Sequence, residues 1–147
     1  SVSQQEGGEQ AGHVQALQDA GLVAESGLQV DAVTTEQSGF EAARELLARD
    51  EPFDAIFAAS DLIAIGAMKA LHERGLRVPE DVAVAGFDDI PMAGFVNPSL
   101  STVQQDTKLA GSMLVENLLR LINDEPVESQ TIPVKLALRK SSGAIQA

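Results

Sequence analysis

The hydrophobic positions of this chain alternate between short continuous runs and stripes at three- and four-residue spacing, most clearly over residues 53–89. The apolar run Ala55–Ala58 predicts a strand buried on both faces, and Val82–Gly86 predicts a second one. The residues between them predict a helix with one buried face. That face comprises Ile63, Ala64, Ala67, Met68 and Leu71. A strand, a crossover helix and a second strand predict a parallel, right-handed βαβ unit.

The same alternation continues on both sides of this unit. We expect helices at Glu9–Ala20 and Ser38–Ala48, a long helix from Asp106 or Thr107 to about Ile122, strands at Leu28–Val33, within 97–103 and at Gln130–Leu138, and a helical turn at Pro91–Phe95. No strand is visible before the first helix. Alternating strands and helices predict an α/β fold, a parallel doubly wound sheet with flanking helices.

Two further segments, the apolar one near Phe95 and the polar tail, carry predictions of their own. Met92, Phe95 and Val96 either fold under the sheet or form a protein–protein patch, and we favour the patch. The polar tail that begins at Arg139 is expected to fray.

Polar residues follow the carboxyl ends of three predicted strands. Thr34 follows the first, Ser60 and Asp61 follow the second, and Asp88 follows the third. Open parallel sheets bind ligands at this edge, because the loops there are free while the strands are packed. Ser60 or Asp61 would also cap the next helix. The edge therefore predicts a small-molecule site, with Asp88 favoured as a ligand contact and Asp61 divided between ligand contact and capping.

Charge and composition restrict the function. A net charge of −12 argues against this segment gripping DNA or an anionic membrane. Without cysteine there is no zinc–thiolate site or cysteine nucleophile, and a cytoplasmic location is expected. His13 and His72 lie far apart, so we expect no metal site. Nucleotide-binding glycine motifs and the GxSxG motif are absent, so we expect neither enzyme activity nor a cofactor. A Mg²⁺ ion held by Asp88 and Asp89 for phosphoryl transfer is a minor alternative.

Several motifs together resemble the lactose-repressor (LacI/GalR) family of transcriptional regulators. They are ASDLIAIGAMKAL from Ala59, GLRVPED from Gly75, VAGFDD from Val84, PSLSTV from Pro98 with Gln105-Asp106, and the closing stretch Val134–Arg139. The resemblance extends over nearly the whole chain. It implies the C-terminal part of a two-lobed, periplasmic-binding-protein-like core, whose small effector binds between the lobes and alters the operator affinity of a helix-turn-helix domain.

The resemblance also implies a division of the chain. Residues 1–106 would form the effector-binding lobe, 107–128 the crossover helix that belongs to the N-terminal lobe in the family, and 129–147 the returning strand and frayed tail. The start of the chain is expected to be a cut end, with the helix-turn-helix domain and most of the N-terminal lobe outside it. We therefore expect the crossover helix to pack on another copy or, unlike in the family, on its own lobe.

Matched position by position, the resemblance assigns site residues. Asp88 would be the effector-binding aspartate, with Ser60 and Asp61 facing the cleft and Gln105 near it. Two further effector-binding candidates depart from the family pattern. Thr34 replaces an aromatic that stacks on the ligand, and Glu9 replaces an arginine. These departures favour a neutral sugar or a cationic ligand over an acid.

The family's dimer contacts would fall on the helix Ile63–Arg74 and the segment Ile90–Phe95. The predicted interface residues are Ile63, Ala67, Met68, Met92 and Phe95. We predict an effector-binding and dimerisation lobe of a LacI-type regulator that senses a sugar-like molecule as a homodimer, without membrane contact, and meets operator DNA only through a domain outside this chain. The alternative is a lobe of a sugar-binding protein from a transport system.

Overall fold

The structure is a computed structural model that describes residues 2–3, 28–130 and 132–143. Its strands are β1 (Val2–Ser3), β2 (Val30–Asp31), β3 (Ala55–Phe57), β4 (Ala83–Phe87), β5 (Ser101–Gln105) and β6 (Val134–Ala137). Its helices are α2 (Glu36–Ala48), α3 (Asp61–Glu73) and α4 (Thr107–Ile122), with 3₁₀ turns η2 (Pro91–Gly94) and η3 (Lys140–Ser142). The helix expected at Glu9–Ala20 lies outside the described residues.

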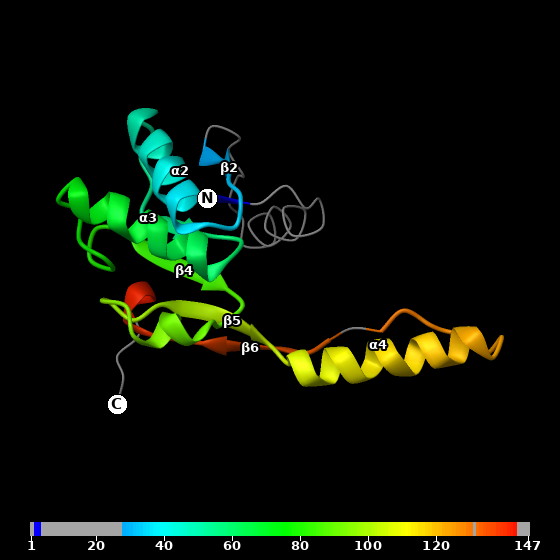
Figure 1. Ribbon diagram of the computed structural model, residues 1–147. Coiled ribbons are helices and arrows are strands. Elements are labelled where there is room, and N and C mark those ends of the chain that lie inside the picture. Colours follow the sequence, from blue (N-terminus) through cyan, green and yellow to red (C-terminus); the bar gives the residue numbers. More distant parts are fainter. Residues whose placement is uncertain (1, 4–27, 131, 144–147) are drawn as a thin grey trace.

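The strands form an open, mixed sheet, which confirms the α/β class (Figure 1). β3, β4 and β5 are parallel neighbours, as the βαβ pattern predicts. The predicted parallel arrangement does not extend to β6, which pairs antiparallel with β5. The reason is the path of the chain, which leaves β5 through α4 and returns along that helix, so β6 runs back from the edge where β5 ended.

A separate pair of parallel strands lies at the start of the described chain. β1 pairs with β2, and β1 also approaches β3. The sequence showed no strand before the first helix, and β1 fills that place. Two residues are too few for a periodic pattern, so this strand depends on its partner.

Helices α2 and α3 pack against each other beside β4 and build the core. The predicted inner face of α3 is confirmed, since all five of its apolar residues are buried. Gly39 of α2 and Gly66 of α3 lie at the closest approach, where an added Cβ would overlap the backbone of the facing helix. This absence of side chains lets the two helices touch directly.

The start of α2 corrects the sequence prediction. The helix begins at Glu36 rather than at Ser38, and Thr35 is its N-cap, because the Thr35 hydroxyl accepts a hydrogen bond from the Ser38 amide at 3.0 Å. Ser38 lies inside the first turn and accepts from the Val33 amide at 2.9 Å. The helix therefore begins two residues earlier than expected, and Ser38 fastens it to the end of the preceding strand.

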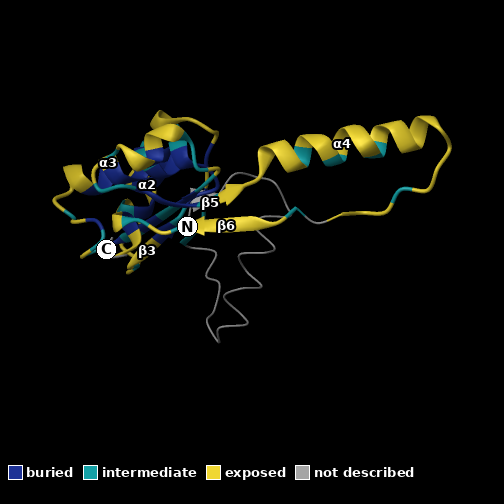
Figure 2. Ribbon diagram, turned by 90° about the horizontal axis from the view of Figure 1, so that it is seen from below, coloured by how far each residue is buried: buried dark blue, intermediate teal, exposed yellow. Residues whose placement is uncertain are grey.

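The chain between β5 and β6 forms an arm that extends away from the sheet (Figures 1 and 2). None of the side chains of α4 is buried among the described residues, although Leu114, Leu118 and Leu121 are apolar. The expectation that this helix might pack on its own lobe is wrong for the described part of the chain. Its apolar surface faces solvent because the linking residues carry it beyond the end of the sheet.

The tail after β6 docks instead of fraying, at least as far as Gly143. Ser141 is fully buried, and its hydroxyl donates to the Val84 carbonyl at 2.6 Å and accepts from the Ser101 amide at 2.8 Å. The hydroxyl thus joins β4 to β5 where their pairing begins. Sequence polarity suggested a solvated tail, but these polar groups serve the backbone of the sheet.

Candidate functional site

Three predicted site residues lie where parallel strands end. Ser60 follows β3, Asp88 follows β4, and Gln105 is the last residue of β5. Because these strands are parallel neighbours, the three positions fall at one edge of the sheet. Asp88 and Gln105 are exposed, whereas Ser60 is buried and caps α3 by accepting from the Ile63 amide at 3.2 Å. The edge therefore presents a carboxylate and an amide to solvent.

The turn that follows β4 has an unusual backbone. Asp88 has φ 111° and Asp89 has φ 55°, a region that residues with a side chain rarely adopt. Three successive amides of this turn are fixed: Asp88 donates to the Val103 carbonyl at 2.9 Å, Asp89 to the Thr102 hydroxyl at 3.2 Å, and Ile90 to the Asp61 carboxylate at 2.8 Å. A strained turn persists only where its surroundings hold it in this way.

Asp61 supplies one of these supports from inside the protein. Its side chain is fully buried at the first turn of α3. One carboxylate oxygen accepts from the Thr102 hydroxyl at 2.7 Å, and the other accepts from the Ile90 amide. The structure thus places Asp61 behind the turn, with both oxygens occupied by protein donors.

The two carboxylates affect each other. Burial raises the pKa of Asp61 above its ordinary value of 3.8, while hydrogen bonds from Thr102 and Ile90 act to lower it. Partial burial raises the pKa of Asp88 above the same ordinary value, and the negative charge of Asp61 adds to the rise. The Asp88 carboxylate at the edge therefore binds a proton more readily than an ordinary aspartate does.

Asp89, the next residue of the turn, forms an ion pair with Arg139. The guanidinium lies 2.9 Å from the Asp89 carboxylate, and both side chains are mostly buried. It also donates to the Leu100 carbonyl at 2.8 Å. Arg139 follows β6 closely, so this ion pair joins the returning strand to the turn that carries Asp88.

The remaining predicted site residues are less closely connected. Thr34 is exposed in the segment after β2, and Glu9 lies outside the described residues. The effector-binding role of Asp88, Asp61, Ser60, Thr34, Gln105 and Glu9 stays a prediction.

The predicted dimer residues separate into two groups. Ile63, Ala67 and Met68 are buried in the core of this chain, so they offer almost no surface to a second copy. Met92 and Phe95 are exposed, Phe95 by 89%. The preference for a patch at 92–96 thus fits these two side chains, while Val96 packs partly against the core.

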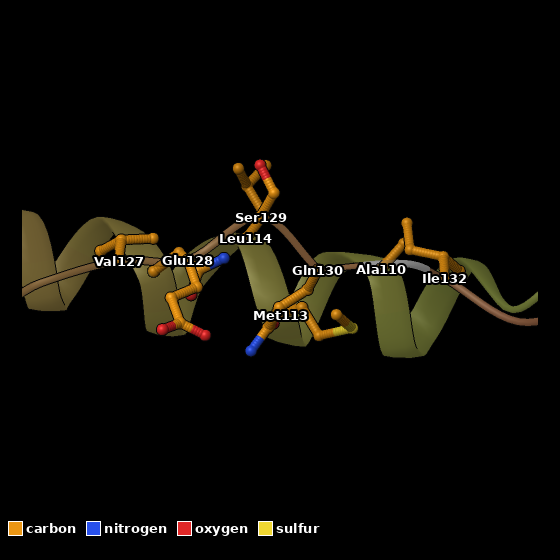
Figure 3. Close-up of a pocket in the computed structure, with 9 residues that line it drawn as sticks. Ala110, Met113, Leu114, Val127, Glu128, Ser129, Gln130 and Ile132 are labelled. Carbon is orange, nitrogen blue, oxygen red and sulfur yellow. The ribbon is translucent and has the colours of Figure 1, made fainter.

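The outer side of α3 has a hollow that helical spacing alone did not single out. It lies between α3 and the segment after η2 and is lined by Ile65, Met68, Lys69, His72, Glu73, Val96 and Asn97. A second, shallow groove runs along the arm, where residues 127–130 and Ile132 lie beside Ala110, Met113 and Leu114 of α4 (Figure 3).

Sequence reasoning missed Thr102, Arg139 and Gly86 as parts of the site. Gly86 lies beside Asp61, and an added Cβ would overlap the Asp61 carboxylate. A glycine inside a predicted strand is a known sign of close approach. Thr102 and Arg139 carried no comparable sign, because their partners lie 41 and 50 positions away in the chain.

Residues 7–142 match the family described as the periplasmic binding protein-like domain. The chain belongs to this family. Among curated relatives, the HTH-type transcriptional repressor PurR of Erwinia tasmaniensis is 38% identical over 87% of this chain and 38% of its own length. The HTH-type transcriptional regulator CelR of Thermobifida fusca is 41% identical over 86% of this chain and 36% of its own length. The chain thus spans less than two fifths of the length of these two relatives.

Solved structures agree with this periplasmic binding protein-like assignment. The Escherichia coli transcriptional repressor ascG matches with a TM-score of 0.82 and 34% identity, over 96% of this chain and 54% of that one. A complex of the regulator CelR with cellobiose matches with a TM-score of 0.81 and 39% identity, over 88% of this chain and 40% of that one. The resemblance to LacI-type regulators that the motifs indicated is confirmed.

Two searches of the described residues were negative. No helix among them is both long and apolar enough to span a bilayer. No three acidic or histidine side chains within the same residues gather as metal ligands would.

Proposed function

We propose that this periplasmic binding protein-like chain is the effector-binding lobe of a LacI-type transcriptional regulator and that its effector is a neutral sugar. The observation that carries the proposal is the Asp88 carboxylate, exposed at the carboxyl edge of three parallel strands on a fixed turn. A carboxylate at such an edge accepts two hydrogen bonds from neighbouring hydroxyl groups of a sugar. The similar regulator CelR, which was solved with cellobiose, supports this ligand class.

The charges around Asp88 favour a neutral ligand over an anion. Asp61 lies behind the turn and Asp89 lies within it, and Arg139, which contacts this turn, is already paired with Asp89. A phosphate or carboxylate ligand would meet net negative charge here. Effector binding would act by population shift. A ligand that prefers one arrangement of the two lobes of such a regulator increases the population of that arrangement.

The test is a thermal-shift screen with neutral sugars, sugar phosphates, purines and amines. A ligand at a hundred times its dissociation constant should add about 2.7 kcal/mol of stability. We expect a neutral sugar to give this shift and Asp88→Ala to abolish it, whereas Asp124→Ala, which changes an exposed aspartate in another part of the chain, should keep it. A shift by purines or sugar phosphates alone would contradict the neutral-sugar proposal.

We also propose that two copies associate through the outer side of α3. The supporting features are the hollow beside α3 and the exposed Met92 and Phe95 on the segment that borders it. Exposed aromatic and apolar residues around a hollow are typical of interface centres.

Sedimentation of Phe95→Asp and Ile65→Asp tests this surface, with Val33→Asp as the control for an exposed apolar residue elsewhere. We expect the first two variants to weaken a dimer that Val33→Asp leaves intact. A wild-type chain that stays monomeric at high concentration, or dimers unaffected by the first two changes, would overturn the proposal.

A further inference from the structure

The turn that carries Asp88 is held by a short relay of hydrogen bonds from two other elements. The Thr102 hydroxyl of β5 accepts from the Asp89 amide and donates to the Asp61 carboxylate. Asp61 in turn accepts from the Ile90 amide. Two side chains thus hold two successive amides of one strained turn.

The relay occupies a buried position that the fold leaves open for it. The Asp61 side chain reaches into the space beside Gly86, where any Cβ would displace it. Asp61, Thr102 and Gly86 are all buried, and both Asp61 oxygens have donors. Burying a charged group costs free energy even when protein donors bond it, so a carboxylate at this position indicates a specific use.

The relay fixes the conformation of the turn that carries Asp88, and this indicates its role. The Asp88 amide donates to the Val103 carbonyl, and the φ of Asp88, 111°, is unfavourable for a residue with a side chain. Without the bonds at Asp89 and Ile90, the turn could relax to a commoner conformation and redirect the Asp88 carboxylate. Arg139 also holds the turn, through its ion pair with Asp89.

Resting on the function proposed above, we infer that Asp61 and Thr102 are positioning residues for effector binding. They do not touch the ligand. They keep the Asp88 carboxylate in the orientation that accepts the ligand's hydroxyl groups, so the site is formed before the ligand arrives. Preorganisation of this kind improves affinity because the ligand does not have to order the turn.

The test compares Thr102→Val, which keeps the shape but removes the hydroxyl, with Thr102→Ser, which keeps the hydroxyl. Ser141→Ala is the control, because it removes another buried hydroxyl that bonds β4 and β5, at the Val84 carbonyl and the Ser101 amide rather than at the amides of the turn. Two quantities are measured: amide hydrogen exchange at Asp89 and Ile90 by NMR, and affinity for cellobiose by calorimetry.

We expect Thr102→Val to speed exchange at both amides about tenfold and to weaken cellobiose binding by a similar factor, the size of one lost hydrogen bond. Thr102→Ser should stay within about threefold of wild type in both measurements. Ser141→Ala should lower stability while leaving both quantities unchanged.

A purely structural role predicts a different result. In that case Thr102→Val would behave like Ser141→Ala, with stability lost but exchange and affinity retained, and the inference would be overturned. If wild type fails to bind cellobiose, the proposed ligand is refuted for that sugar. The exchange rates still decide whether the relay holds the turn, so the two failures are distinguishable.

Discussion

At the scale of single residues, Gly86 determines whether the site can exist. It lies within β4, and the Asp61 carboxylate occupies the space that a side chain at this position would fill. An added Cβ would also lie only 3.2 Å from a methyl group of Leu100, so it would be crowded by a second neighbour. Because Gly86 has no side chain, β4 leaves room for the Asp61 carboxylate of α3.

Gly86→Ala should therefore destabilise the protein by about 2–4 kcal/mol, because it combines overpacking with broken hydrogen bonds of a buried carboxylate. Urea denaturation measures the change. Gly94→Ala is the matched control, since an added Cβ there meets nothing within 4 Å, and it should stay within about 0.5 kcal/mol of wild type. Equal effects of the two changes would contradict the packing argument.

The charge of Asp88 makes stability depend on pH with a defined sign. Its pKa is raised in the folded state, so the folded protein binds more protons than the unfolded one between the ordinary value of 3.8 and the raised value. Stability from this group therefore falls as pH rises through that interval. Asp88→Asn removes the effect, and its stability relative to wild type should increase from acidic to neutral pH in urea titrations.

Asp81 serves as the control, because its effect on the pH dependence of stability should have the opposite sign. Hydrogen bonds from Arg77 hold the pKa of Asp81 below its ordinary value of 3.8. Its contribution is present above the ordinary value and is lost as pH falls through the lowered one. Asp81→Asn should consequently be less stable than wild type at neutral pH and lose this disadvantage in acid. The same trend in both variants would contradict the assignment of these shifts.

At the scale of elements, the contact between α2 and α3 organises the core. Gly39 and Gly66 face the backbone of the opposite helix, so neither can accept a methyl group unless the helices separate. Nearby, Phe40 of α2 lies within 5.6 Å of the Lys69 ammonium of α3 and 5.7 Å of the Arg44 guanidinium. The glycine contacts and the Phe40–Lys69 contact join α3 to α2, whereas the Phe40–Arg44 contact lies within α2. They thereby help to position Ser60 and Asp61 at the start of α3.

Gly39→Ala and Gly66→Ala should each cost about 2–4 kcal/mol in urea denaturation, because backbone atoms cannot yield as a flexible side chain does. Gly111→Ala in α4 has open space and should instead be neutral or stabilising by up to about 1 kcal/mol. A small effect at Gly39 and Gly66 would mean that the helices are farther apart in solution.

At the scale of the whole molecule, the chain consists of a packed lobe and an exposed arm (Figure 2). The lobe has a continuous core, whereas α4 leaves Leu114, Leu118, Leu121 and Ile122 in solvent. Such an apolar surface is unusual unless something covers it. The two parts should therefore differ widely in local stability.

Hydrogen exchange read by mass spectrometry can show this difference. Amides of α4 should exchange within about tenfold of an unfolded peptide at low protein concentration, because a 16-residue helix without packing is marginal in water. Amides of α3 should be far slower. Protection of α4 that increases with protein concentration would show that a second copy covers it, and strong protection at every concentration would contradict an exposed arm.

The sequence by itself determined the elements whose pattern is local. The runs at 55–58 and 82–86, the stripe of α3 and the position of Asp88 after a strand could all be predicted, since periodicity and chain order fix which residues are buried and which edge they meet. The motifs also indicated the family.

Tertiary structure alone decided the features that depend on distant partners. β6 runs antiparallel because of the path of the arm, and the tail docks because Ser141 reaches backbone groups 40 or more positions away. Asp61 could have faced a ligand or the protein interior on sequence grounds, and only Thr102 and Ile90 place it behind the turn. Hydrogen bonds between such distant residues leave no periodic trace in the sequence, so their geometry emerges only when the chain is folded.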